Sequence, residues 1–279
     1  MNKRLVYLIL FLASAWVLSS CKEDTLDMTV LTKTMFEDAV VDEINATAGW
    51  NVTVVQDSRK TGVELEYSAF LEDYLRIQKD GSALHVGFSQ RLILPTATVK
   101  NVTVYVPSLR QLTLTEAATA DLQGSCSGTS LSVDLDKGAI MRGGQFSGDL
   151  QMKLNHASTV ADFVFDGASA NLRLENASVF KGVLTTSDLL EIYISEASRM
   201  TTYSGSSPEA NVTMNDASFL NMTQTEIAEM HLSLQSASEA SVMVTSTLEA
   251  YLRDASKLYY LGNPIKNIDA DDSSSCCPL

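Results

Sequence analysis

Apolar and polar residues recur along this chain in a unit of about 20 residues, which appears eight times between Leu112 and Ser256. In each unit two apolar residues flank an outward-pointing one, two further residues follow, and a pair of small residues ends the segment. The pairs are separated by 21, 19, 20, 20, 20, 20 and 18 residues, and they are Ala117-Ala118, Gly138-Ala139, Ala157-Ser158, Ala177-Ser178, Ala197-Ser198, Ala217-Ser218, Ala237-Ser238 and Ala255-Ser256. A period this constant predicts a solenoid, in which each repeat is one coil stacked on the next.

Alignment of the units on the small pair produces columns of apolar residues. One column, three residues before the pair, runs from Leu114 to Leu252, and a second, five residues before it, runs from Leu112 to Ala250. Apolar, polar, apolar is the pattern of a strand with one buried face. A further apolar column, from Val160 to Leu258, follows the pair and predicts a second strand in each coil.

We therefore expect an all-β fold, a single-stranded right-handed parallel β-helix (solenoid) of about 20 residues per coil. At each corner we expect the first small residue, such as Ala197, to face inward, where the bend leaves room only for a small side chain. The Ser that follows can pass hydrogen bonds from coil to coil. A leucine-rich repeat is disfavoured, because its asparagine position is Ala or Gly in every unit and no helical segment follows the strand.

The chain divides into five segments by pattern and composition. Residues 1–20 are interpreted as a lipoprotein signal peptide and residues 21–34 as a tether. Residues 35–110 are expected to form a β-rich N-terminal part of the head domain that starts and caps the solenoid, since an open end would expose apolar ladders. Residues 111–262 form the repeat part of the same domain, and residues 263–279 are interpreted as a flexible C-terminal tail.

The first segment has the features of a bacterial lipoprotein signal. Lys3 and Arg4 precede an apolar run that is too short for a comfortable transmembrane helix. The run ends in Leu18-Ser19-Ser20-Cys21, which resembles a lipobox, so Cys21 is the predicted lipidation site and membrane anchor. Lys22-Glu23-Asp24 is similar to the tag that sends Bacteroidetes lipoproteins to the outer face of the outer membrane. We expect an outer-membrane lipoprotein exposed at the cell surface, with a periplasm-facing position as the alternative.

The net charge excludes one class of partner, and the cysteine count leaves a question open. The formal net charge is −14, and loss of the signal peptide leaves 18 basic against 34 acidic residues. Nucleic-acid binding needs clustered Lys and Arg, so no nucleic-acid partner is expected. Cys126, Cys276 and Cys277 remain after lipidation of Cys21, an odd number for an oxidising compartment, and their role stays open.

Candidate ligand-contacting residues come from the outward position of the first strand. That column carries Lys153, Arg173, Tyr193 and Tyr251, whose charges and aromatic rings could contact sugar rings or a partner protein. Strand propensity alone also places tyrosine at such positions.

The three histidines have no metal-ligand spacing, and catalytic motifs are absent. No catalytic residue, metal or cofactor is expected, and the chain is predicted not to be an enzyme.

Several segments together resemble one known family. They are Phe36 to Gln56, Tyr74 to Phe88 and Val102 to Leu122, followed by the coils with small-residue corners. This order, after a lipoprotein signal, is similar to the autotransporter-adhesin head (GIN) domain lipoproteins of Bacteroidetes, over about residues 35 to 262. The resemblance implies a right-handed β-helix-like fold on a cell envelope and an adhesin-like role, with no defined ligand or catalytic residues to carry over.

The function predicted from these observations is adhesion, or binding of an extended glycan or partner protein, by a lipid-anchored head. A polysaccharide-degrading β-helix enzyme is one alternative, because Asp134, Lys153, Arg173 and Tyr193 share the outward column; paired carboxylates are missing, however. A purely structural envelope protein is the other alternative. The sequence does not identify the ligand.

Overall fold

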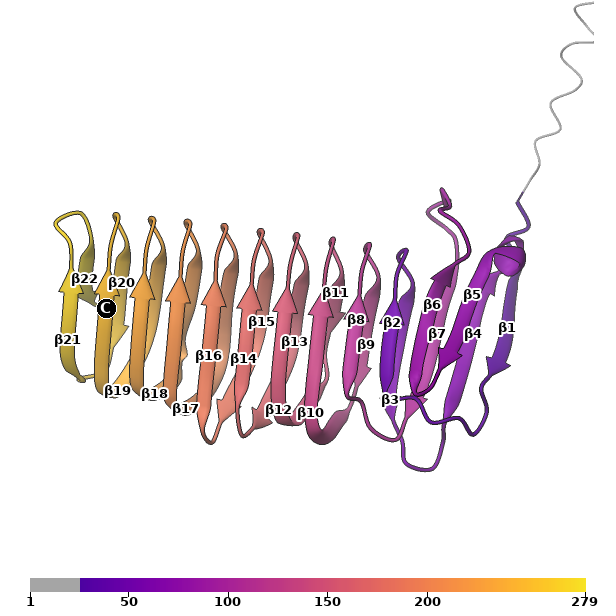
Figure 1. Ribbon diagram of the computed structural model, residues 1–279, viewed down its shortest axis with the longest axis horizontal. Helices are drawn as coiled ribbons and strands as arrows, with labels where there is room; N and C mark the ends of the chain where they lie inside the picture. Colours follow the sequence, from indigo (N-terminus) through magenta and orange to yellow (C-terminus); the bar gives the residue numbers. More distant parts are fainter. Residues whose placement is uncertain (1–25) are drawn as a thin grey trace, which may run out of the picture.

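The computed structural model describes residues 26–279, and it is a flattened β-solenoid (Figure 1). Strands make up 65% of it and helix 2%, so the expected all-β solenoid of parallel stacked coils is confirmed. Each coil crosses a front layer, bends at a corner, and returns through a back layer. The corners align along one edge of the molecule, the upper edge in Figure 1, which we call the corner edge.

The front layer is the nearer row of strands in Figure 1. Neighbouring strands of the repeats pair in parallel, and only the first two strands of the row are antiparallel. In spatial order the layer contains β5 (Leu75–Asp80), β6 (Ala83–Phe88), β2 (Glu43–Ala46), β8 (Gln111–Leu114), β10 (Ser125–Leu135), β12 (Gln145–Leu154), β14 (Ala170–Leu174), β16 (Leu189–Ile194), β17 (Arg199–Met214), β18 (Phe219–Leu234), β19 (Glu239–Leu252) and β21 (Ile265–Ala270).

The back layer runs alongside it. The long strands β10, β12, β17, β18 and β19 begin on the back-layer side of one coil and end in the front layer of the next. The remaining strands of this layer are β1 (Val30–Met35), β4 (Gly62–Ser68), β7 (Lys100–Val106), β3 (Asn51–Gln56), β9 (Thr119–Gln123), β11 (Ile140–Arg142), β13 (Thr159–Gly167), β15 (Val179–Thr186), β20 (Lys257–Leu261) and β22 (Ser275–Pro278).

The core is the space between the two layers. Residues of the predicted apolar columns stack in register, as in the pairing of Leu172 with Ile192 and of Ile192 with Val212, and they are buried. Large rings fill the gaps, with Phe146, Phe163, Phe165 and Phe180 fully buried. Because successive strand residues point to opposite faces, the alternating pattern alone orients these side chains inward.

The corners are tight turns, and one expectation about them is wrong. Glu196 and Ala197 both have a left-handed backbone, with φ of 55° and 59°, and the Ser198 N–H donates to the Ser195 carbonyl at 3.2 Å. Two left-handed central residues are the mark of a type I′ turn. Ala197 is exposed and Ser198 is buried, so the inward small residue is the second of the pair. The left-handed backbone disfavours β-branched side chains at both central positions of the turn, and unbranched residues such as Glu196 and Ala197 occupy them.

Corner hydrogen bonds close each turn and join neighbouring coils. The Ser238 hydroxyl donates to the Gln235 carbonyl of its own turn at 2.7 Å. Between coils, the Ala197 N–H donates to the Asp216 carbonyl at 2.9 Å. The predicted coil-to-coil role of serine appears where the Ser178 N–H donates to the Ser198 hydroxyl at 3.1 Å.

The solenoid begins before the recognised repeats. β2 and β3 form a coil of their own, which pairs with β8 and β9 on one side and with β6 and β7 on the other. Beyond it, β5 pairs antiparallel with β6, and β4 pairs antiparallel with both β7 and β1. These antiparallel strands close the N-terminal end. Residues 30–34 were expected in the tether, but they belong to β1, because their backbone groups pair with β4.

The last segment is also folded. Residues 263–279 contain β21 and β22, joined by a corner in which the Ser274 N–H donates to the Asp271 carbonyl at 3.2 Å. They pair with β19 and β20 as a further coil, so the interpretation as a flexible tail is wrong. Their apolar pattern is weak because Lys266 and Ala270 occupy the positions opposite the buried Leu248 and Leu252 of β19, and both are exposed at the end of the solenoid.

Candidate functional site

One continuous row of outward-facing residues crosses the whole front layer. Each member lies opposite the next in the strand register, from β5 at one end to β21 at the other. We call it the outward row; its members are Gln78, His85, Asn45, Thr113, Asp134, Lys153, Arg173, Tyr193, Thr213, Ser233, Tyr251 and Asp269. All four candidate residues from the sequence belong to this row, since they occupy the same position in successive units.

Three of the candidates lie on consecutive coils. Lys153 is opposite Arg173, and Arg173 is opposite Tyr193. The Arg173 guanidinium lies 4.2 Å from the centre of the Tyr193 ring and donates to a Glu175 carboxylate oxygen at 2.6 Å. This hydrogen bond lowers the pKa of Glu175, with a smaller contribution from the charge of Lys153, and it raises the pKa of Arg173.

The fourth candidate lies apart from them. Tyr251 is separated from Tyr193 by the coils that carry Thr213 and Ser233. Arg253 stacks on the Tyr251 ring at 3.6 Å and pairs with Asp269 at 2.7 Å. Sequence reasoning did not select Arg253, although its spacing of two residues from Tyr251 would have placed it on the same strand face. An arginine therefore covers each tyrosine of the row: Arg173, within the row, covers Tyr193, and Arg253, beside the row, covers Tyr251.

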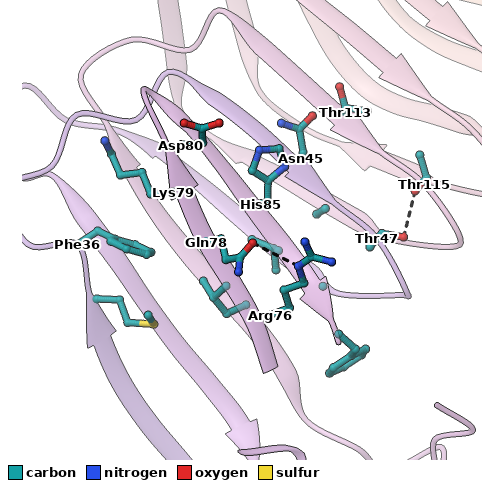
Figure 2. Close-up of a pocket in the computed structure, with 16 residues that line it drawn as sticks. Phe36, Asn45, Thr47, Arg76, Gln78, Lys79, Asp80, His85, Thr113 and Thr115 are labelled. Carbon is teal, nitrogen blue, oxygen red and sulfur yellow. Dashed lines mark hydrogen bonds between the residues drawn. The ribbon is translucent and has the colours of Figure 1, made fainter. Parts of the chain in front are cut away.

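A depression of about 800 Å³ lies at the N-terminal end of the row, over β5, β6, β2 and β8 (Figure 2). Asn45, His85 and Thr113 of the outward row line it, and Phe36 stands at its side. Gly87 contributes no side chain to the floor, where an added methyl group would lie 2.9 Å from the Thr47 side chain. No sequence signal indicated this depression, because its walls come from strands distant in the chain.

A second, smaller depression of about 400 Å³ lies toward the other end. Thr213, Ser233 and Tyr251 of the row line it, where short side chains follow one another on neighbouring coils. At its side, the His231 ring nitrogen lies 3.1 Å from a Glu249 carboxylate oxygen. The Lys153–Arg173–Tyr193 segment of the outward row therefore lies between the two hollows.

The described residues contain no cluster of three metal-ligating side chains. Within residues 26–279, no helix is long and apolar enough to cross a membrane.

The three cysteines of the described residues are free thiols. Cys126 is buried, which raises the pKa of its thiol, whereas Cys276 is half-buried and Cys277 is exposed. The predicted lipidation site Cys21 and the Lys22-Glu23-Asp24 segment lie outside the described residues.

Comparison with known proteins gives a family and a fold. The model of the family described as "Putative auto-transporter adhesin, head GIN domain" matches residues 41–264. None of the curated proteins matches. A crystal structure of a "putative adhesin" from Parabacteroides merdae is 14% identical with a TM-score of 0.65, and covers 90% of this chain and 96% of its own.

Two proteins from Parabacteroides distasonis have the same fold. One, described as a "putative lipid binding protein", is 13% identical with a TM-score of 0.62, and the match covers 91% of this chain and 98% of that one. The other, a "putative adhesin", is 13% identical with a TM-score of 0.57 and the same coverage. The family and these neighbours are described as adhesins or as a lipid-binding protein, not as enzymes.

Proposed function

Because this chain belongs to the adhesin-head GIN domain family, we propose that it is a lipid-anchored envelope protein whose head binds an extended glycan along the outward row. The observation that carries the proposal is the continuity of this row across every coil of the front layer. Neighbouring coils repeat about every 4.8 Å, so a linear polymer can make similar contacts coil after coil. Many weak contacts of this kind add up through multivalency.

The chemistry of the row favours a glycan over a strongly charged polymer. Thr113, Thr213 and Ser233 offer hydroxyl groups, and Asn45 offers an amide, all of which can hydrogen-bond sugar hydroxyls. The Arg–Tyr pairs add flat surfaces on which a sugar ring can pack. The net charge of −14 opposes a polyanion at long range.

The envelope location agrees with the adhesin-like family. The finer assignment, an outer-membrane lipoprotein exposed at the cell surface, rests on the lipobox at Cys21 and the acidic segment after it. Cys21→Ser should move the protein from the membrane fraction to the soluble fraction. Unchanged membrane association would remove the anchoring part of the proposal and leave the binding part standing.

Binding is tested on a glycan array with the purified protein and a paired variant, Tyr193→Ala with Tyr251→Ala. We expect the variant to lose most binding to the glycans that the wild type retains, with its circular dichroism spectrum unchanged. Tyr203→Ala is the control, since Tyr203 is a tyrosine on the back-layer part of β17 that is at least as exposed as the two in the row. Equal loss in the control would remove the outward row as the binding surface.

Two other outcomes would replace the proposal. Cleavage of a polysaccharide that disappears in Lys153→Ala or Arg173→Ala would make the protein an enzyme of the β-helix lyase type. Absence of both binding and turnover across glycans and envelope proteins would favour a structural role in the envelope.

A further inference from the structure

The loop between β6 and β7, residues 89–99, rises beyond the corner edge at the N-terminal end of the solenoid (Figure 1). Ile93 is fully exposed, with a relative accessibility of 101%. Its neighbours Leu92 and Leu94 are half-buried and pack against the core. Burial alternates along these three residues, so Ile93 faces solvent while the leucines on either side of it face the core. The exposure of Ile93 therefore follows from the packing of the loop against the core.

The same part of the molecule holds the start of the described chain. The Ser89 N–H, at the base of the loop, donates to the carbonyl of Tyr74, the last residue of the 3₁₀ helix η1 (Ala69–Tyr74). At the other end of η1, the Phe70 N–H donates to the Asp27 carbonyl at 3.1 Å. The loop and the first described residues are thus both hydrogen-bonded to one short helix, and both lie at the upper right of Figure 1.

The predicted anchor brings this end close to a bilayer. Cys21 is six residues before Asp27, and six residues span at most about 20 Å when fully extended. Leu26, Val30 and Leu31, next to the entry point, are also exposed apolar residues. Arg91 is exposed beside the loop tip, where a cation can meet lipid phosphates.

We propose that residues 89–99 form a second membrane contact, in which Ile93 inserts into the lipid surface. The inference rests on the anchored location in the proposed function and adds an orientation to it. A lipid chain and an inserted side chain are two attachment points, so the head no longer turns freely about its tether. Because both attachment points lie at the N-terminal end, the rest of the solenoid can project away from the membrane and leave the outward row accessible.

The test uses residues 22–279 with a hexahistidine tag in place of the lipid, held on vesicles of phosphatidylethanolamine and phosphatidylglycerol that contain a nickel-chelating lipid. An environment-sensitive dye is attached at Ile93→Cys in a Cys276→Ser, Cys277→Ser background, where the remaining Cys126 is buried. The control carries the dye at Lys257→Cys, an exposed strand residue just after a distant corner.

At position 93 we expect a blue shift of the emission, loss of most of its intensity to nitroxide-bearing lipids, and protection from iodide. At position 257 we expect no change. A dye at position 93 that stays accessible to iodide and unaffected by nitroxide lipids would overturn the proposal, and so would protection from iodide without lipid quenching, which indicates contact between protein copies. Because the tag supplies the attachment, these results are independent of the Cys21→Ser fractionation.

Discussion

The guanidinium of Arg173 lies 4.2 Å from the ring centre of Tyr193, although 20 residues of chain separate the two. The contact exists because one coil contains that number of residues, so equivalent positions become neighbours in space. The same arrangement makes the surface of this protein a set of rows, each one residue wide, and any row can be altered one coil at a time.

This contact should be measurable as a coupling energy. Arg173→Ala and Tyr193→Ala, alone and together, form a double-mutant cycle on the free energy of unfolding in urea. We expect a coupling of about 0.5–1 kcal/mol, the range for a partly exposed cation–π pair. A second cycle, Arg173→Ala with Tyr203→Ala, joins residues on different layers and should show no coupling. Equal coupling in the two cycles would mean that the substitutions act through the whole solenoid.

The left-handed corners predict a selective cost for branched side chains. Ala197→Val places a β-branched residue at a φ of 59°, where the branch strains χ1, and we expect it to lower the free energy of unfolding by about 0.5–1.5 kcal/mol. Thr201→Val introduces the same side chain in the adjoining strand β17, where β-branched residues are favoured, and it should have little effect on stability. Thermal denaturation of both variants measures the difference. If both melt like the wild type, the corner is not constrained as described.

Close approach between coils predicts that Gly205 cannot be replaced. A Cβ at this position would lie 1.8 Å from the Leu184 carbonyl oxygen of the preceding coil, and φ is 134°. We expect Gly205→Ala to lower the free energy of unfolding by at least about 2 kcal/mol. Gly128→Ala is the control, because its nearest neighbours would be 3.9 Å away. A tolerated Gly205→Ala would show that the coils separate at little cost.

Acidification should loosen the last coil first. Asp271 accepts hydrogen bonds from the Asp254 N–H at 2.7 Å and from the Ser273 N–H and hydroxyl, and these bonds hold its pKa well below the usual 3.8. A depressed pKa in the folded state contributes stability above pH 3.8, and this contribution is lost as the pH falls toward the folded pKa. We expect amide hydrogen exchange in β21 and β22, corrected for intrinsic rates, to rise below pH 3.8, while β16 stays protected.

Asp271→Asn provides the comparison for that measurement. The Asn side chain keeps one acceptor oxygen but does not titrate in this range. Exchange in β21 and β22 of this variant should therefore lose most of its dependence on acid. If the wild type and the variant respond alike, other carboxylates control the stability of the last coil.

The features that the sequence predicted correctly are periodic ones. Columns such as Leu172, Ile192 and Val212 are buried in register, because strand alternation and a constant repeat length are properties of the chain itself. The adjacency of Arg173 and Tyr193 follows from the same period. The family resemblance was also confirmed, over residues 41–264, although the functional role of the row stays a prediction.

The sequence by itself thus determined the coil, its inward columns and the outward row. Tertiary structure alone decided which small residue faces inward. The left-handed turn places Ala197 outside and Ser198 inside, and the residue types of the pair do not reveal the type of turn. It also decided that β1 and the last coil are ordered, because pairing of backbone groups with a neighbouring strand stabilises segments whose own apolar pattern is weak. The larger hollow and the exposed Ile93 likewise arise only where segments distant in the chain are packed together.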